Sequence, residues 1–276
     1  MSILESILYG LISGVVEFFP ISGQATQQIL LRMFGVGGRE PLRDLVVHLA
    51  ALAGLILACR GYFSKLLRDH RTAQSLANAA HHRHELRGIY DLRVVKMASV
   101  VMLLGMLLGL FVRKWESNLI VIIIFCLING LIMFLPERLP QGNKDARSMS
   151  ALESFFVGIG AALACFPGIS RIGTSMCASA VCGADRRHAL NWALLMSIPG
   201  LCMLTILDVL TMIQLGVGIL SWLVFAGYIL SAVSAFVGAY FGVMMMRIWV
   251  LRSGFSGFAY GSWGMAIFTF VLYLIV

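Results

Sequence analysis

An arginine and three hydroxyl residues stand between two apolar runs in the stretch Ala164-Cys165-Phe166-Pro167-Gly168-Ile169-Ser170-Arg171-Ile172-Gly173-Thr174-Ser175. The flanking runs, 155–166 and 176–184, carry no charge. Pro167 and Gly168 are expected to end a helix, and Gly173 to allow a tight backbone before the next helix begins. Because an arginine at membrane depth is costly unless it is paired or lines a wet cavity, two interpretations follow. The stretch is either an ordinary interfacial loop or an anion site, in which Arg171 and helix-end N–H groups face a phosphate or carboxylate.

The composition is that of a membrane protein. Of the 276 residues, 59% are hydrophobic and only 12% are charged, whereas soluble domains are about 25% charged. Repeated apolar runs of about 18 residues or more predict a polytopic helical protein, and the lack of polar–apolar alternation argues against a barrel. We expect no cleavable signal peptide, because residues 1–9 hold no basic residue. The net charge of +8 is attributed to topology and anionic lipid, with no nucleic-acid partner, and the six cysteines to packing.

Six segments are apolar and long enough to span a bilayer. They are 44–59, 97–112, 119–135, 189–210, 217–246 and 255–276. Segments 4–34 and 151–184 each join two short apolar runs through a Pro/Gly break, which predicts re-entrant helical hairpins. Segment 60–96 is expected to be a basic polar loop, in which His81, His82 and His84 either bind a metal or are solvated.

An internal repeat supports this division. Glu5-Ser6-x-x-x-Gly10 ahead of Phe19-Pro20-Ile21-Ser22 recurs as Glu153-Ser154-x-x-x-Gly158 ahead of Phe166-Pro167-Gly168-Ile169-Ser170. The predicted fold is an all-α polytopic membrane protein with two inverted-topology repeats, each a re-entrant helical hairpin plus three transmembrane helices. It forms a single membrane domain over 1–276, with repeat 1 at 1–135, a linker at 136–150 and repeat 2 at 151–276. The two Pro-containing tips would approach the midplane from opposite faces, where inverted repeats place a ligand.

Lysines and arginines set the expected orientation. Most of the 21 lie in 60–96, in 136–150 and at the ends of the later spans, all on one side of the predicted membrane. The positive-inside rule places that side in the cytoplasm. Both termini are then expected outside.

The motifs resemble the undecaprenyl-pyrophosphate phosphatase (bacitracin-resistance) family. The matching stretches are Glu17-Phe18-Phe19-Pro20-Ile21-Ser22, Asp44-Leu45-Val46-Val47-His48-Leu49, Pro167-Gly168-Ile169-Ser170-Arg171-x-Gly173, and Pro199 with Asp208 nine residues later. The resemblance implies a multi-pass protein of the bacterial plasma membrane that handles a polyprenyl pyrophosphate. In the family, carboxylates and a divalent cation (Mg²⁺ or Ca²⁺) hold the pyrophosphate, the motif arginine stabilises it, and a Ser/His pair in the first hairpin serves hydrolysis.

The catalytic half of that pattern is altered. The family reads E-x-x-x-E-F-x-P-x-S-S-x-x-H in the first hairpin. Here Ser13 replaces the first carboxylate, Gly23 the second serine and Thr26 the histidine. Gly23 offers no nucleophile and Thr26 no base near neutral pH, while Glu17, the one candidate metal ligand, makes a poor cation site alone.

The phosphate-binding half is kept. Its predicted members are Glu17, Ser22, Ser170, Arg171, Gly173, Thr174 and Ser175. Glu17 is expected either to pair with Arg171 in the empty site and release it to phosphate, or to form a purely structural pair. The candidates for a rebuilt catalytic site are Ser22, Thr26 or Ser175 as nucleophile and His48 as base. His48, four residues after Asp44 on one helical face, is alternatively a structural histidine, and Asp208 is expected to be an interfacial carboxylate.

Three functions therefore stay open. The first is a non-hydrolysing binder or translocator of polyprenyl phosphate or pyrophosphate, involved in recycling of the lipid carrier. The second is an active undecaprenyl-diphosphate phosphatase with a rebuilt site. The third is a small-solute transporter on the same fold. A homodimer is also open, because Gly238-x-x-x-Gly242 permits close helix packing within one chain or between two.

Overall fold

The chain is all-helical in the computed structural model, which describes residues 1–36, 40–78, 92–140, 142–144, 148–215, 222–252 and 254–275. Those residues contain no strand beyond one isolated bridge between Lys144 and Ala184. Six helical segments are long and apolar enough to cross a membrane: Pro41–Ala58, Val95–Val112, Leu119–Arg138, Arg186–Leu215, Val224–Val250 and Ser256–Ile275. The prediction of a polytopic helical membrane protein with six spans is confirmed.

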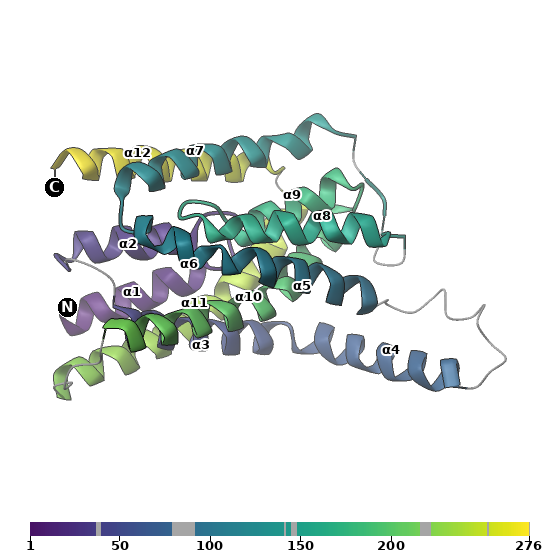
Figure 1. Cartoon of the computed structure of the whole chain (residues 1–276), viewed down its shortest axis with the longest axis horizontal. Coiled ribbons are helices and arrows are strands. Elements are labelled where there is room, and N and C mark those ends of the chain that lie inside the picture. The colour runs from purple at the N-terminus through teal and green to yellow at the C-terminus, as the bar shows by residue number, and fades with distance from the viewer. Residues whose placement is uncertain are drawn as a thin grey trace.

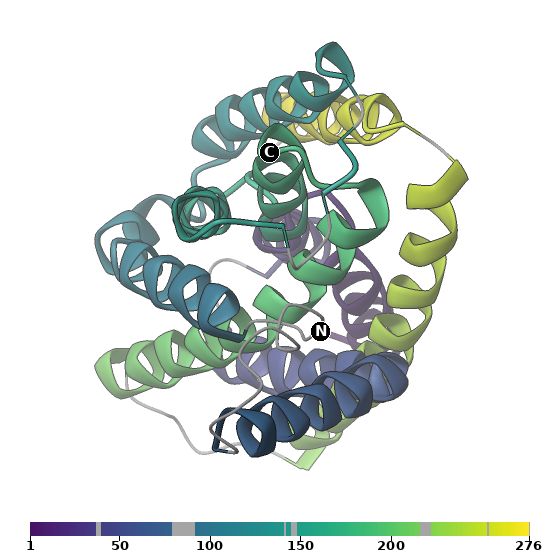
Figure 2. The same cartoon turned by 90° about the vertical axis from the view of Figure 1, so that its right-hand side faces the viewer.

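The helices assemble into one elongated bundle (Figure 1). In chain order they are α1 (Ile3–Val16), α2 (Gly23–Met33), α3 (Pro41–Ala58), α4 (Arg60–Asn78), α5 (Leu92–Leu107), α6 (Gly109–Val112), η2 (Arg113–Trp115), α7 (Leu119–Phe134), η3 (Leu135–Arg138), α8 (Ala151–Ala162), η4 (Leu163–Cys165), α9 (Arg171–Val181), α10 (Arg186–Leu215), α11 (Trp222–Arg252) and α12 (Ser256–Ile275). The principal helix pairs are α1 on α11, α3 on α11 and α10, α7 on α12, and α5 on α8. Seen end-on, α7 and α12 at the top, α11 at the right and α3 and α4 at the bottom surround the α1–α2 pair (Figure 2).

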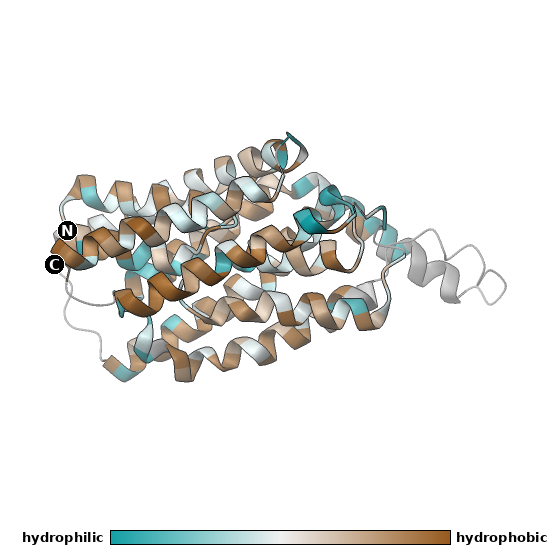
Figure 3. Cartoon of the chain, turned by 90° about the horizontal axis from the view of Figure 1, so that it is seen from above, coloured by the Kyte–Doolittle hydropathy of each residue, from teal (hydrophilic) through white to brown (hydrophobic). Residues whose placement is uncertain are grey.

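Apolar side chains cover the outside and polar side chains gather inside. Phe111 and Ile213 are 75% and 72% exposed, whereas Asn129 and Ser231 are fully buried. In Figure 3, the brown of hydrophobic residues predominates over teal along the helices of the bundle. This distribution suits lipid as the solvent, because every polar group at that depth needs a partner within the protein.

Two short helix pairs enter the bundle from opposite ends. α1 starts at the end where α12 finishes, whereas α8 starts at the other end, and the turns after α1 and α8 approach each other in the middle (Figure 1). The start of α1 and the end of α12 share one end of the bundle, as the prediction for the termini requires. Inverted repeats and the outside location of the termini stay predictions.

The glycine pair in α11 is used inside the chain. A Cβ atom at Gly238 would lie 2.4 Å from the carbonyl oxygen of Leu11, and one at Gly242 would lie 2.7 Å from that of Val15. The two glycines therefore let α11 pack closely against α1. They supply no argument for a homodimer.

The expected loop over 60–96 is wrong for its first part, which forms α4. Leu66 is buried against Val95 of α5 and Leu195 of α10, while Lys65 and Arg68 are exposed. Overall polarity hid this helix, of which Phe63 and Leu66 pack against the bundle. His81, His82 and His84 lie outside the described residues. All six cysteines are free thiols, and four of them are buried, as the packing interpretation predicts, whereas Cys202 is exposed.

Candidate functional site

The turns after α1 and α8 are joined by the serines that cap the following helices. Ser22 caps α2 and Ser170 caps α9, each accepting a hydrogen bond from the backbone N–H three residues on. The backbone N–H of Gly168 donates to Ser22 Oγ (3.1 Å), and Ser170 Oγ donates to the carbonyl oxygen of Phe19 (3.0 Å). This reciprocal bonding holds the beginnings of α2 and α9 next to each other.

Asn129 of α7 braces the same junction. Its Nδ2 donates to the carbonyl oxygen of Pro20 (3.1 Å) and to Ser262 Oγ (2.7 Å), and its Oδ1 accepts from the backbone N–H of Ser170 (3.0 Å). The side chain is fully buried. We did not select this residue from the sequence, although a single asparagine inside the apolar run 119–134 is a signal of the expected kind.

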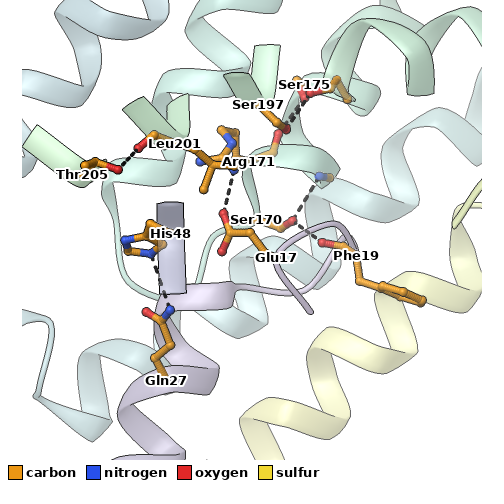
Figure 4. Close-up of polar contacts among 12 residues, drawn as sticks. Glu17, Phe19, Gln27, His48, Ser170, Arg171, Ser175, Ser197, Leu201 and Thr205 are labelled. Carbon is orange, nitrogen blue, oxygen red and sulfur yellow. Dashed lines mark hydrogen bonds and ion pairs between the residues drawn. The ribbon is translucent and has the colours of Figure 1, made fainter. Parts of the chain in front are cut away.

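Glu17 and Arg171 form a buried ion pair between the two turns (Figure 4). Arg171 Nη2 donates to Glu17 Oε1 at 2.7 Å, and the side chains are only 5% and 8% exposed for Arg171 and Glu17 respectively. The predicted pair is confirmed. Arg171 is the first residue of α9, so Gly173 lies within the first helical turn and not, as expected, before the helix. Its side chain lies against α10, where a Cβ at Gly200 would come within 2.8 Å of Arg171 Cδ.

A small cleft opens beside the ion pair. Its lining includes Glu17, Gly23, Gln24, Met106, Arg171 and Leu204. Arg171 Nε and Gln24 Oε1 are buried, and neither has a hydrogen-bond partner among the residues that the structure describes. Buried polar groups are rarely left unpaired, so two of them at one cleft point to a polar ligand.

The predicted hydroxyl residues serve the backbone in this conformation. Thr174 Oγ1 donates to the carbonyl oxygen of Ser170 (2.8 Å), and Ser175 Oγ donates to that of Arg171 (2.6 Å). Thr26 Oγ1 likewise donates to the carbonyl oxygen of Ser22 (2.9 Å). Glu17, Ser170 and Arg171 all line the cleft. The hydroxyls of Thr26, Thr174 and Ser175 each cap a local carbonyl, as serines and threonines in helices commonly do.

His48 of α3 pairs with Asp208 of α10. Its Nδ1 lies 2.7 Å from Asp208 Oδ2, and its Nε2 lies 3.5 Å from Gln27 Nε2. Asp208 is 1% exposed, so this carboxylate is buried inside the bundle, while its interfacial depth stays a prediction. α10 continues to Leu215, which places Asp208 about two turns inside the helix end.

Comparison with known proteins places the chain in a family. The family model described as "Bacitracin resistance protein BacA" matches residues 6–268. The chain belongs to this bacitracin-resistance family. It is similar to proteins named undecaprenyl-diphosphatase from Methanobrevibacter smithii (25% identical; 98% of this chain and 98% of the relative), Carboxydothermus hydrogenoformans (26%; 99% and 98%) and Treponema denticola (28%; 89% and 88%). The resemblance seen in the sequence is confirmed.

The three departures from the bacitracin-resistance pattern leave the first hairpin without new chemistry. Ser13 is buried, and its Oγ has no hydrogen-bond partner within the described part of the chain. Gly23 presents bare backbone to Glu17, and the hydroxyl of Thr26 is bonded to the carbonyl oxygen of Ser22. None of the three supplies a carboxylate, an activated nucleophile or a base.

The divalent cation that the bacitracin-resistance pattern implies does not fit the residues present. In the described ranges, no group of three or more His, Cys, Asp or Glu side chains is placed to hold a metal ion. Glu17, the predicted metal ligand, is paired with Arg171, whose charge opposes a cation. Mg²⁺ and Ca²⁺ prefer several oxygen ligands, so we derive no step through a metal.

Proposed function

We propose that this protein binds the phosphate or pyrophosphate headgroup of a polyprenyl lipid in the cleft between the two turns, without hydrolysing it. The observation that carries the proposal is the buried Arg171, which lines the same cleft as Gln24 and Ser170 and whose Nε has no partner within the described residues. A guanidinium held in this way offers charge-assisted hydrogen bonds to a phosphate. The binder would act as a carrier or translocator in recycling of the lipid.

The surroundings of the cleft favour a lipid ligand. Ile21, Met106 and Leu204 line it together with the polar residues, and the bundle around it has an apolar outer surface. An isoprenoid chain would leave the headgroup site along such a surface at little cost. The family relatives named undecaprenyl-diphosphatase agree with this substrate class.

The absence of hydrolysis rests on the first hairpin. Thr26, at the family's histidine position, donates its hydroxyl hydrogen to the backbone, and Gly23 has no side chain. Among the described residues that line the cleft, Glu17 is the one carboxylate, and Arg171 neutralises it. Phosphoryl transfer needs a positioned nucleophile, a proton acceptor and charge stabilisation, of which this cleft offers only the last.

The architecture suits movement of the headgroup between two faces. Two hairpins that enter from opposite ends and touch at their tips resemble the broken helices of inverted-repeat transporters, where gating of one repeat against the other exposes a fixed site in turn. In this proposal the repeats are 1–135 and 151–276, the protein lies in the bacterial plasma membrane, and both termini lie outside. A homodimer is not required.

One observation favours hydrolysis as a second candidate function. His48 and Asp208 form a buried pair in which a carboxylate orients an imidazole, as in general-base sites. With Thr26 and Ser175 donating to backbone carbonyls, Ser22 is the nucleophile that this candidate would use. Its hydroxyl oxygen already accepts hydrogen bonds from the backbone N–H groups of Ala25 and Gly168. Both donors lie on the oxygen that would have to attack phosphorus.

The test measures binding of undecaprenyl phosphate and phosphate release from undecaprenyl pyrophosphate by the purified protein, with and without Mg²⁺ or Ca²⁺. Arg171→Ala removes hydrogen bonds to the anion worth about 1.5–3 kcal/mol each, so we expect affinity to fall about 100-fold, with no phosphate release in the wild type. Arg32→Ala, which removes an exposed arginine from the end of α2, is the matched control and retains affinity. Arg171-dependent phosphate release would establish the second candidate. If neither lipid binds, transport of a small solute is the function that stays open.

A further inference from the structure

Gly23 determines where the Glu17 carboxylate sits. A Cβ atom at residue 23 would lie 2.4 Å from Glu17 Oε2, far inside van der Waals contact. Glu17 Oε1 meanwhile accepts the hydrogen bond from Arg171 Nη2. The carboxylate thus fits between a residue without a side chain and the arginine, and it occupies space that any other residue at position 23 would fill.

In this position the Glu17 carboxylate competes with a phosphate group for Arg171. Glu17 and Arg171 are both largely buried. Because little water reaches them, each charge is stabilised mainly by the other. A phosphate group that binds Arg171 meets the negative charge of Glu17 at the same cleft. The anion and the carboxylate therefore exclude each other unless Glu17 moves.

We propose that Gly23 and Glu17 form a latch on the anion site: the missing side chain at residue 23 admits the Glu17 carboxylate, which holds Arg171 until a phosphate headgroup displaces it. This inference rests on the proposed function and adds regulation of the same site. The latch lowers the apparent affinity by the fraction of molecules in which the arginine is open to the ligand. Weak, reversible binding of this kind suits a carrier that must release its cargo.

The geometry predicts the effect of restoring a side chain at residue 23. The atom that an alanine would meet is the far end of a flexible glutamate, so rotation of the carboxylate can relieve the clash without a shift of the backbone. Gly23→Ala should then open the latch. Glu17→Gln should open it independently, because the amide keeps the shape but loses the charge that holds the arginine.

The experiment measures the apparent Kd for undecaprenyl phosphate by calorimetric titration of the full-length protein in detergent. Gly23→Ala and Glu17→Gln should each tighten binding about tenfold, the change expected when the latched state outweighs the open state about ten to one. Gly264→Ala is the control for a glycine replaced by alanine, because a Cβ there meets open space. It should leave the Kd unchanged. Arg171→Ala is measured in parallel.

The possible results distinguish failure of the latch from failure of the proposed function. If Arg171→Ala lowers the affinity about 100-fold while Gly23→Ala and Glu17→Gln weaken binding or leave it unchanged, the latch is overturned and the proposed function stands. If only Glu17→Gln tightens binding, the role given to Gly23 is overturned. If the wild type binds undecaprenyl phosphate no better than Arg171→Ala does, the proposed function itself fails.

Discussion

The α1–α2 pair and the α8–α9 pair begin alike and differ where their turns meet. Ser2 with Glu5, and Ser150 with Glu153, form complete capping boxes at the starts of α1 and α8. Each pair then turns at a Phe-Pro sequence into a helix capped by serine. The shared residues are those that start and stop helices, so they maintain the fold in both pairs.

The differences lie at the tips and concern the ligand. The α8–α9 turn has an extra residue, Gly168, and supplies the cation Arg171, whereas the α1–α2 turn supplies the anion Glu17 and the bare backbone of Gly23. Neither tip makes a site alone, because the ion pair and both serine bridges cross between them. Each helix pair supplies one of the two charged side chains at the cleft.

Substitution of Gly168 should have the largest effect on stability and should mark the longer turn as the rigid one. Gly168 has φ +112°, and a Cβ there would lie 2.8 Å from the carbonyl oxygen of Ile122. Backbone strain and overpacking together predict that Gly168→Ala lowers the free energy of unfolding by about 4 kcal/mol. Thermal unfolding in detergent measures this, with Gly264→Ala as control. An unchanged melting temperature would show that α7 does not confine this turn.

Removal of the Asn129 side chain should weaken the junction between the α1–α2 turn and the α8–α9 turn. Asn129→Ala loses three hydrogen bonds and leaves the backbone N–H of Ser170 without its side-chain partner, which predicts a loss of about 3 kcal/mol in unfolding free energy. The exposed helix cap Asn118, replaced by alanine, is the control and should cost about 1 kcal/mol. If the two variants melt alike, the brace contributes nothing beyond an ordinary cap.

Replacement of His48, which lies on α3, asks whether the protein retains a base that could serve hydrolysis. His48→Asn keeps an N–H near Asp208 but removes the imidazole, and we expect a loss of about 1–2 kcal/mol in unfolding free energy with the affinity for undecaprenyl phosphate unchanged. Equilibrium unfolding and calorimetric titration check the two parts. Phosphate release that is present in the wild type and absent from His48→Asn would support hydrolysis.

The smallest effects should come from the two capping boxes. Ser2→Ala and Ser150→Ala each remove one cap and should each cost about 1 kcal/mol in unfolding free energy, with no effect on ligand affinity. Equal shifts in melting temperature would agree with equivalent roles in the two pairs. A change in affinity from either variant would mean that the far ends of the pairs also shape the cleft.

Hydropathy was enough to predict the six spans, because apolar length is a local property of the chain. It failed at α4, a polar helix with few apolar residues, and at the end of α10, which extends beyond the predicted span. The pairing of Glu17 with Arg171 was predictable because a buried charge demands a partner.

The rest of the site depends on contacts that no local pattern reveals. Asn129 is one polar residue in an apolar run, and its partners come from residues 20, 170 and 262. Asp208 meets His48 across 160 positions of sequence. The contact between Gly23 and the Glu17 carboxylate requires a known rotamer, so the sequence could only identify Gly23 as a missing serine.

Single-turnover analysis tests the central claim most directly. Protein in molar excess is mixed with undecaprenyl pyrophosphate, and the lipid that copurifies with it is extracted and identified by mass spectrometry. We predict that wild-type protein returns intact undecaprenyl pyrophosphate and that Arg171→Ala retains none. Recovery of undecaprenyl phosphate from the wild type, with release of one inorganic phosphate for each lipid, would contradict the account.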